Sequence, residues 1–529
     1  KQITAYVDCA ALAREAGYDG VEIMGSEGYF INQFLSERTN KRTDRWGGTA
    51  ENRRRIAVEI VRRTRERVGK DFLIIYRLSM ADLVEGGQSW DEVVALGKEI
   101  EAAGASIINT GIGWHEARVP TIVTSVPRAA FTSVTAAFRP HVNIPVVTSN
   151  RINLPQVAEE VLARGDADLV SMARPFLADP EWVLKATTDR ADEINVCIAC
   201  NQACLDHVFA KKKASCMVNP RAARETELQL LPTRRSKSVA VVGAGPAGLA
   251  AAVTAAERGH RVELFEAADE VGGQFGIARR IPGKEEFAET IRYYRRRLDL
   301  TGVKLHLGRR AGAEDLAGFD EIVLATGVVP RVPAIPGIDH PKVLSYVDVV
   351  RDGKPVGDSV AVIGAGGIGV DVSEFLTSAT SDLEGWKAEW GVGDPTELPG
   401  ALAVPRPEPS PRKVYLLQRK DGKIGAGLGR TTGWVHRAAL KNKQVEQLRG
   451  VNYERIDDEG LHITFGPKRE KARMLAVDNV VICAGQEPLR ELVDALAGRS
   501  VHLIGGADVA AELDAKRAIE QATRLALAL

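Results

Sequence analysis

Glycine recurs at one fixed spacing in two parts of this chain, each time directly after a short apolar run. Gly243, Gly245 and Gly248 follow the predicted strand Val239–Val242 and open a run of small residues that predicts a helix. In such a unit the first glycine makes the tight turn, the second lets backbone approach a pyrophosphate, and the third lets helix and strand pack closely. The next predicted strand ends at Glu266, where a carboxylate would bind ribose hydroxyls. We therefore expect a Rossmann-like dinucleotide-binding domain.

The second occurrence is followed by basic residues instead of an acid. Its three glycines are Gly364, Gly366 and Gly369. The next predicted strand, Val414–Leu417, leads into Gln-Arg-Lys. A carboxylate here would repel a 2′-phosphate, whereas Arg419 and Lys420 would neutralise one. The pattern favours NADP(H) over NAD(H), unless these two cations only solvate a loop.

The first 191 residues alternate short apolar runs with amphipathic helical patterns, which predicts βα units. The predicted strands are Gly20–Met24, Phe72–Leu78, Ser106–Thr110, Pro145–Ser149 and Leu169–Ala173. Their spacing of roughly 30 residues is that of a (β/α)8 barrel. Because five strands cannot close a barrel, we expect its N-terminal part, roughly 100 residues, to be absent from this chain. The predicted fold class is α/β, a (β/α)8 barrel followed by two Rossmann-like domains.

Four of the six cysteines lie within twenty residues, at the spacing C-x2-C-x3-C-x11-C. They are Cys197, Cys200, Cys204 and Cys216. Structural zinc sites usually combine two separate C-x2-C pairs, whereas three ligands within eight residues suit three corners of an iron–sulfur cubane. We expect a [4Fe–4S] cluster; zinc and unliganded thiols are the alternatives. A redox-inert zinc ion would have no role between a barrel and a dinucleotide module, whereas a cluster passes single electrons.

The overall composition excludes several kinds of partner. Lys plus Arg and Asp plus Glu both number 70, so nothing favours nucleic acid or an anionic membrane. No long apolar run and no signal peptide is present, so we expect a soluble, cytoplasmic protein. The sequence leaves the oligomeric state open and is compatible with a monomer.

The segments "EAADEVGGQF", "EIVLATGVVP" and "VVICAGQEP" resemble those of the two-dinucleotide flavoprotein reductases. The resemblance implies FAD at the first glycine site, a nicotinamide cofactor in an inserted domain, and a return of the chain to the FAD domain. The implied FAD residues are Gly243, Gly245, Ala247, Gly248, Glu266, Gly273, Gln274 and Asp508. Asp508 is expected to open a helix that points at the flavin. The C-x4-C disulfide of many such reductases is absent, so electrons must leave FAD by another route.

These features divide the chain into four predicted parts. Residues 1–191 are the C-terminal five βα units of the barrel, and residues 192–236 carry the cluster and a linker. Residues 237–345 and 485–529 form the FAD domain, and residues 346–484 form the NADP(H) domain. Within the last, the Pro- and Gly-rich stretch Thr377–Arg412 is predicted to be loop with at most short helices.

The barrel part resembles the old yellow enzyme superfamily. The run "GYFINQFLS" followed by N-x-R-x-D-x-x-GG-x-x-ENR is characteristic of it. The resemblance implies an FMN site formed by Arg77, Arg151, Ala173 and Arg174. One of the three arginines is expected near the flavin ring and two near the phosphate. On structural grounds alone, Arg77 could instead be a salt-bridge partner.

Within that superfamily, the order of the parts and "GIGWHEARVPTI" resemble the bacterial 2,4-dienoyl-CoA reductases. The resemblance implies that Tyr29 and His115 are catalytic. The implied substrate-binding residues are Arg38, Glu116, Ala117 and Arg118. By chemistry alone, a single His in this context could equally be structural.

The implied reaction is NADPH-dependent reduction of 2,4-dienoyl-CoA to enoyl-CoA in unsaturated fatty acid β-oxidation. Electrons would pass from NADPH to FAD, to the cluster, to FMN and then to the acyl-CoA substrate. A trimethylamine-dehydrogenase-like amine dehydrogenase is the main alternative. In such enzymes a barrel cysteine holds FMN covalently, and the only barrel cysteine here, Cys9, falls on a predicted helix. A flavin and iron–sulfur electron carrier is the third hypothesis, although a carrier needs no proton donor.

Overall fold

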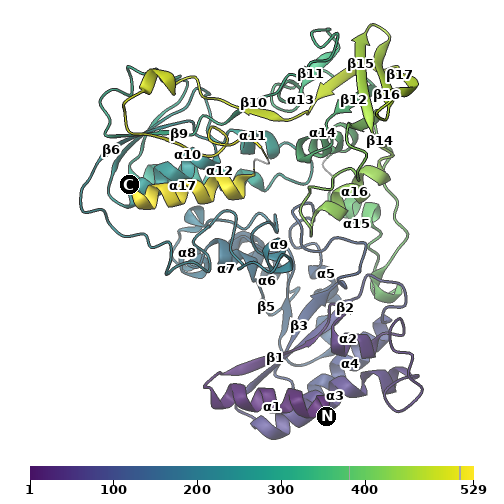
Figure 1. The fold of residues 1–529 in the computed structure, drawn as a ribbon. Coiled ribbons are helices and arrows are strands. Elements are labelled where there is room, and N and C mark those ends of the chain that lie inside the picture. Colours follow the sequence, from purple (N-terminus) through teal and green to yellow (C-terminus); the bar gives the residue numbers. More distant parts are fainter. Residues whose placement is uncertain (380–381, 512–513) are drawn as a thin grey trace. The chain divides into compact units, whose positions relative to one another are not determined.

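The computed structural model describes residues 1–379, 382–511 and 514–529. The chain separates into two compact units (Figure 1). Unit 1 contains residues 1–173 and 381–408, and unit 2 contains residues 174–380 and 409–529. No helix among the described residues is long and apolar enough to cross a membrane.

Unit 1 is built on one sheet of five parallel strands. The strands are β1 (Gly20–Gly25), β2 (Leu73–Ala81), β3 (Ile107–Ile112), β4 (Val146–Thr148) and β5 (Leu169–Val170). They pair in sequence order, β1-β2-β3-β4-β5, as consecutive strands of a barrel do. The five predicted strands are therefore confirmed. Within the described residues the sheet is open, with β1 and β5 at its edges, and a closed barrel remains a prediction.

The helices of unit 1 begin and end where the sequence pattern changes. They are α1 (Gln2–Glu15), α2 (Phe30–Leu35), α3 (Ala50–Val68), α4 (Trp90–Ala102), α5 (Thr132–Phe138), η1 (Arg139–His141) and α6 (Pro155–Ala163). Ser89 caps α4 in a reciprocal capping box with Glu92, which satisfies two free N–H groups. Thr49 caps α3 by accepting a hydrogen bond from Asn52 N.

In the described part of the Pro- and Gly-rich stretch the helices are short, as predicted. They are α15 (Leu383–Trp390) and η3 (Pro399–Ala401). Trp386 and Trp390 are buried, and Trp386 contacts Phe131 edge-on with ring centroids 5.9 Å apart. This segment lies within unit 1, although its neighbours in sequence belong to unit 2. The sequence pattern did not indicate that placement.

Unit 2 begins with short helices and then contains two parallel sheets of five strands. The short helices are α7 (Arg174–Ala178), α8 (Trp182–Thr187), η2 (Ala191–Glu193) and α9 (Leu205–Phe209). The first sheet has the order β20-β9-β6-β7-β8. Its strands are β6 (Ser238–Val242), β7 (Arg261–Phe265), β8 (Lys304–His306), β9 (Glu321–Leu324) and β20 (Val501–Leu503). The last strand thus returns to this sheet after the intervening domain.

Helices cover the first sheet and supply most of its core. They are α10 (Pro246–Glu257), α11 (Gln274–Ala278), α12 (Phe287–Thr301), η4 (Asp494–Leu496) and α17 (Ala515–Ala528). Figure 1 shows α10, α12 and α17 lying together below this sheet. Every residue of α10 from Ala247 to Ala255 is buried, because its small side chains allow close approach to β6 and α17.

The second sheet of unit 2 has the order β11-β18-β12-β13-β14. Its strands are β11 (Val343–Ser345), β12 (Ser359–Ile363), β13 (Lys413–Gln418), β14 (Glu446–Arg449) and β18 (Asn479–Ile482). The helices of this part are α13 (Tyr346–Val350), α14 (Gly367–Thr377) and α16 (Gly433–Asn442). An antiparallel sheet, β15 (Val451–Asp457), β16 (Gly460–Phe465) and β17 (Glu470–Leu475), follows β14. Two short strands, β10 (Val328–Pro330) and β19 (Gln486–Pro488), pair with each other. They lie where the chain leaves the domain of the first sheet and where it returns to that domain.

Candidate active site and cofactor sites

Tyr29 and His115 lie in contact in unit 1. Tyr29 immediately precedes α2, four residues after β1, and His115 follows β3 by three residues. The carboxyl ends of parallel strands meet at one edge of a sheet, which brings these two loops together. Tyr29 Oη lies 2.6 Å from His115 Nε2, and the rings meet at 74° with centroids 5.0 Å apart. Tyr29 is 48% exposed, so its hydroxyl remains accessible from solvent.

The surroundings of Tyr29 favour its protonated form. Partial burial, followed by the negative charges of Glu27 and Glu116, raises the pKa of Tyr29 above its ordinary value. The hydroxyl therefore keeps its proton at neutral pH. Loss of that proton needs a partner that stabilises the phenolate, and His115 is within hydrogen-bond distance to do so.

The predicted substrate-binding residues differ in their exposure and in their contacts. Glu116 and Arg118 are exposed beside His115, whereas the side chain of Ala117 is buried. Arg38 is exposed, and its guanidinium donates to the carbonyl of Glu85 at 3.3 Å. The structure therefore brings Glu116 near Tyr29 and gives Arg38 a bond to a different loop.

Among the predicted FMN residues, Arg77 lies in the middle of its strand, whereas Arg151 and Arg174 lie beyond the ends of β4 and β5. Arg77, within β2, forms ion pairs with Glu22 at 3.0 Å and Glu27 at 3.4 Å, so the salt-bridge alternative describes its contacts here. Arg151 is buried at a positive φ of 60° and donates to the carbonyl of Val126. Their roles towards FMN remain predictions.

Arg174 lies in a different setting from the other two arginines. Ala173 is the last residue of the first stretch of unit 1, and Arg174 begins α7 in unit 2. The Arg174 guanidinium donates to Asn201 Oδ1 at 2.6 Å, inside the cysteine segment. Its positive charge also acts to lower the pKa of Cys204, although burial dominates and raises it.

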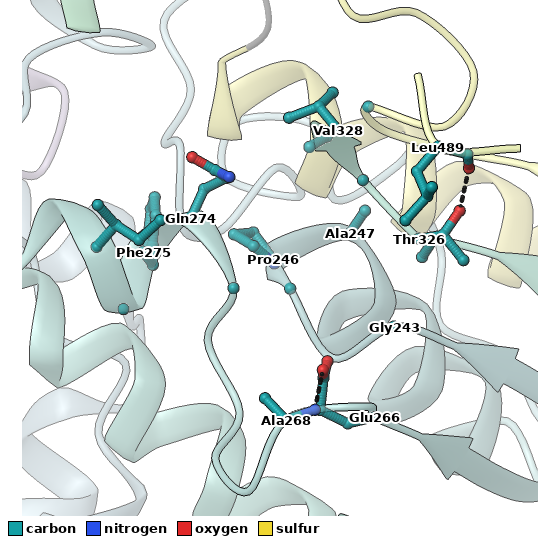
Figure 2. Close-up of a pocket in the computed structure, with 18 of the residues that line it drawn as sticks. Gly243, Pro246, Ala247, Glu266, Ala268, Gln274, Phe275, Thr326, Val328 and Leu489 are labelled. Carbon is teal, nitrogen blue, oxygen red and sulfur yellow. Dashed lines mark hydrogen bonds between the residues drawn. The ribbon is translucent and has the colours of Figure 1, made fainter. Parts of the chain in front are cut away.

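The first glycine motif opens onto a cavity of about 510 Å³ in unit 2. Figure 2 shows Gly243, Pro246 and Ala247 on one side of it, Glu266 below, and Gln274 and Phe275 opposite. Glu266 accepts hydrogen bonds from the backbone of Ala244 at 2.6 Å and Ala268 at 2.9 Å. The cavity has the size of a cofactor site and a carboxylate where ribose hydroxyls would bind. Its lining fits FAD.

Gly248 of this motif and Gly273 in the loop before α11 are both required by close backbone contacts. A Cβ on Gly248 would lie 1.8 Å from the carbonyl oxygen of Gly243, which no rearrangement of a side chain could relieve. Gly273 has φ of +49°, and a Cβ there would approach Gly245 Cα to 3.0 Å. The turn before α10 and the loop before α11 therefore pack backbone against backbone.

The expectation for Asp508 is wrong in one respect. The final helix, α17, begins at Ala515, and its N-cap is Asp514, whose side chain accepts from Arg517 N at 2.7 Å. Asp514 lines the cavity together with Ala515 and Ala518. Asp508 instead accepts from Gln521 at 2.7 Å. The apolar residues after Asp508 suit a helix equally well, so the sequence did not separate the two aspartates.

The second glycine motif repeats the first in its geometry. A Cβ on Gly369 would lie 1.7 Å from the carbonyl oxygen of Gly364, matching the contact in the first motif. Gly366 is the N-cap of α14. Arg419 and Lys420 follow β13 directly and are exposed, as a pair that binds an incoming phosphate must be. The structure thus places these five residues at the end of one sheet.

We expect the double variant Arg419→Ser, Lys420→Ser to lose its preference for NADPH. Two charge-assisted contacts of about 1.5–3 kcal/mol in all correspond to a rise in KM for NADPH of roughly 10- to 100-fold. The KM for NADH should stay within about twofold. Steady-state kinetics with both cofactors measures this, with Lys441→Ser on α16 as control. Equal changes in both KM values would contradict the 2′-phosphate assignment.

The four clustered cysteines converge in unit 2 on the loop that precedes α9. A narrow pocket is lined by Cys197, Cys200, Cys204 and Cys216, together with Arg174, Asn201 and apolar side chains. Burial, with the neighbouring Cys216, raises the pKa of Cys200 well above its ordinary value. Backbone N–H groups of Val218 and Asn219 donate to Cys216, whose pKa burial nevertheless raises to about 12.

The spacing of these thiols bears on the choice between zinc and a cluster. A tetrahedral zinc site with Zn–S of about 2.3 Å places its sulfurs about 4 Å apart. Among the described residues, no three of the four sulfurs lie within 4.8 Å of one another. In this arrangement the thiols are therefore too far apart to bind one zinc ion without movement. The raised pKa values of Cys200, Cys204 and Cys216 keep these three thiols protonated when no group is bound.

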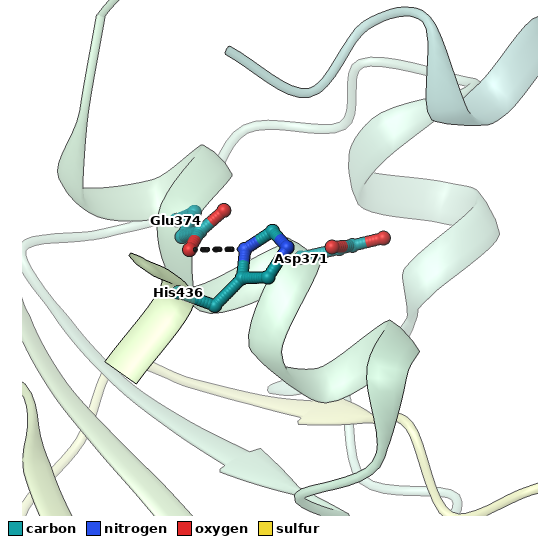
Figure 3. Close-up of side chains that lie close together, drawn as sticks. All are labelled: Asp371, Glu374 and His436. Carbon is teal, nitrogen blue, oxygen red and sulfur yellow. Dashed lines mark hydrogen bonds and ion pairs between the residues drawn. The ribbon is translucent and has the colours of Figure 1, made fainter. Parts of the chain in front are cut away.

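A second group of possible ligands lies between α14 and α16. Figure 3 shows His436 between Glu374 and Asp371, with Nδ1 2.8 Å from Glu374 Oε1. Burial opposes the charge of His436, but Glu374 outweighs it and the net effect raises the pKa of His436. Lys284 Nζ already pairs with Asp371 at 2.5 Å. These contacts form an ion-pair network that joins α14, α16 and the loop of Lys284.

Comparison with known proteins accounts for both halves of the chain. Residues 1–193 match the NADH:flavin oxidoreductase / NADH oxidase family, and residues 237–513 match the pyridine nucleotide-disulphide oxidoreductases. A metal reductase of Desulforamulus reducens is 36% identical over 508 residues, 95% of this chain and 75% of that protein. The chain belongs to the NADH:flavin oxidoreductase / NADH oxidase family. It is therefore an oxidoreductase that uses FMN in its first part and FAD with a nicotinamide cofactor in its second.

Two further relatives extend the comparison. An NADH oxidase of Thermoanaerobacter brockii is 38% identical over 71% of this chain, which spans 59% of that protein. The solved complex of 2-naphthoyl-CoA reductase with 2-naphthoyl-CoA matches all of this chain and 76% of its own, with a TM-score of 0.89 and 31% identity. The flavin oxidoreductase superfamily predicted from the sequence is thus confirmed; the individual substrate is not.

Proposed function

We propose that this protein reduces 2,4-dienoyl-CoA to enoyl-CoA with electrons from NADPH, as required in the β-oxidation of unsaturated fatty acids. The observation that carries the proposal is the 2.6 Å contact between Tyr29 Oη and His115 Nε2 at an accessible edge of the unit 1 sheet. Adding hydride to a conjugated thioester leaves an enolate that must be protonated. A neutral tyrosine paired with a histidine supplies that proton.

Each residue has a separate task in this proposal. The Tyr29 hydroxyl donates its proton to the carbon chain, and His115 holds the hydroxyl in place and stabilises the phenolate that remains. Glu27 and Glu116 keep the hydroxyl protonated until the enolate forms, because both raise the pKa of Tyr29. When bound, FAD, an iron–sulfur cluster and FMN supply the electrons of the reduction.

The four cysteines are proposed to hold the cluster as [4Fe–4S]. Cys197, Cys200, Cys204 and Cys216 line one pocket, and their sulfurs are too widely spaced for zinc. Arg419 and Lys420 are proposed to select NADPH, and the cavity beside Gly243 to hold FAD. Relatedness to a reductase of an aromatic acyl-CoA supports a thioester substrate.

An amine dehydrogenase is the competing function, and the structure weakens one form of it. Cys9, the cysteine nearest the barrel strands, lies on α1 and is exposed. The position of Cys9 on a helix, as predicted, weakens the form of this function in which a barrel cysteine holds FMN covalently. Electron flow separates the two functions, because a dienoyl-CoA takes electrons from the enzyme and an amine gives electrons to it.

The deciding experiment is anaerobic stopped-flow spectroscopy of the cofactor-loaded protein. We expect NADPH to bleach the flavin absorbance and hexa-2,4-dienoyl-CoA to restore it, with hexenoyl-CoA as the product. Sarcosine and dimethylamine should leave the oxidised protein unchanged. Bleaching by either amine, with no reoxidation by the dienoyl-CoA, would overturn the proposal.

A further inference from the structure

Asp82 is a buried carboxylate just beyond the carboxyl end of β2, with four neutral donors around it. Only 1% of its surface is exposed. Its Oδ1 accepts from Ser79 Oγ at 2.5 Å, Trp114 Nε1 at 2.9 Å and Asn32 Nδ2 at 3.3 Å. Its Oδ2 accepts from Gln88 N at 2.8 Å. Because one acid holds three separate segments, its loss would release all of them.

One of these segments ends at Tyr29. Asn32 lies in α2 and is fully buried. While its Nδ2 donates to Asp82, its Oδ1 accepts from Gly28 N at 2.8 Å. Gly28 has φ of +79°, and a Cβ there would lie 2.9 Å from the Trp114 ring. Asp82 thus fixes, through Asn32, the residue immediately before Tyr29.

Another segment leads directly to His115. Trp114 is bound to Asp82 twice, by its indole N–H at 2.9 Å and by its backbone N–H to the Asp82 carbonyl at 3.0 Å. Its ring is buried and packs against Gly28. Tyr29 and His115 are each therefore one residue away from a group that Asp82 holds.

The stretch 382–408, which also belongs to unit 1, forms hydrogen bonds with the loop that follows Asp82. Leu83 N donates to the carbonyl of Gly400 at 2.8 Å, and Gly400 N donates to the carbonyl of Gln88 at 2.8 Å. Gly400 has φ of +63°, and a Cβ there would lie 3.2 Å from the Val84 carbonyl oxygen. The two hydrogen bonds bracket residues 83–88, so the loop has little freedom to move.

We propose that Asp82 is the positioning residue that sets the distance between Tyr29 Oη and His115 Nε2. It touches neither of them and acts through Asn32 and Trp114. The kinetic consequence rests on the proposed function, because it concerns the proton that this pair donates. The geometric consequence does not depend on the substrate.

The test is Asp82→Asn, which keeps size and shape. If the amide oxygen of the variant side chain accepts from Ser79, Trp114 and Asn32, its NH2 group faces the N–H of Gln88. If the amide is flipped, the NH2 group faces the other three donors instead. In either orientation two donors therefore face each other. We expect the rate of flavin reoxidation by hexa-2,4-dienoyl-CoA to fall roughly 10- to 100-fold, since misplacing a reacting group by about 1 Å costs on the order of 10²-fold. Flavin reduction by NADPH and the KM for the thioester should be unchanged.

A double-mutant cycle separates positioning from general damage. In a Tyr29→Phe background, Asp82→Asn should have little further effect, because the group that it positions is gone. Additive losses would show that Asp82 acts elsewhere. Asp168→Asn is the matched control, since Asp168 also accepts a backbone N–H in unit 1 but precedes β5 at the opposite end of the sheet. Gly400→Ala should reproduce the effect of Asp82→Asn in weaker form.

A spectroscopic measurement decides the inference without turnover. The protein has nine histidines, and the ¹⁵N ring signal of His115 can be assigned by its loss in His115→Gln. It should shift in Asp82→Asn in the same direction as in Tyr29→Phe, and stay in place in Asp168→Asn. An unmoved signal in Asp82→Asn overturns the inference. If the parent protein is not reoxidised by the dienoyl-CoA, the proposed substrate fails while this signal still decides the role of Asp82.

Discussion

Replacing Tyr29 by Phe should slow reoxidation of the reduced protein by dienoyl-CoA by 10²- to 10⁴-fold, the usual effect of losing a positioned acid. The ring packing against His115 is kept, and only the hydroxyl at 2.6 Å is lost. NADPH-driven flavin reduction should proceed at the parent rate, because the nucleotide sites lie in unit 2. Rapid mixing of each half-reaction measures the two separately.

The pH dependence of this step follows from the surroundings of the same tyrosine. Partial burial, Glu27 and Glu116 raise the pKa of Tyr29, so the protonated donor persists up to and beyond the ordinary tyrosine pKa. The parent rate should therefore not decline as pH rises from neutrality towards that value. His115→Ala should slow the same step, and the double variant should be little worse than the slower single one. If Tyr29→Phe reduced dienoyl-CoA at the parent rate and gave the parent product, the hydroxyl would have no role in the mechanism.

Replacing Cys200 by Ser should remove iron from the protein and abolish NADPH-dependent reduction of the thioester. Cys200 is half-buried and lines one pocket with the other three thiols, and serine replaces a soft thiolate ligand with a hard, protonated hydroxyl. Bleaching of FAD by NADPH should persist, because its cavity contains no cysteine among its lining residues. Iron analysis, sulfide analysis and half-reaction kinetics together measure these outcomes.

Cys9→Ser is the matched control for this substitution. Cys9 is exposed on α1, so its replacement should change neither iron content nor rate. One zinc and no iron in the parent protein would refute the cluster. Full thioester reduction in an iron-free Cys200→Ser protein would equally show that electrons reach the substrate by another route.

Several parts of the site could be predicted from the sequence because their chemistry depends on fixed local offsets. A Cβ at Gly248 or Gly369 would strike a carbonyl five residues earlier in the chain, so the glycine spacing alone specifies the turn. The five strands of unit 1 were recognisable because each is a short apolar run between polar helices. The four cysteines lie within twenty residues of one another in sequence, so their convergence also follows from spacing.

Other features were decided only by the tertiary structure, because they join residues far apart in sequence. Tyr29 and His115 are 86 residues apart, and only the parallel order of β1, β2 and β3 brings their loops to one edge. Asp82 carries no motif, and its four donors come from segments that fold together around it. The helix cap at Asp514 and the placement of residues 382–408 in unit 1 likewise depended on packing. Local spacing thus determined the turns and the cysteine cluster of the candidate cofactor sites, and long-range packing determined where the proposed proton donor lies.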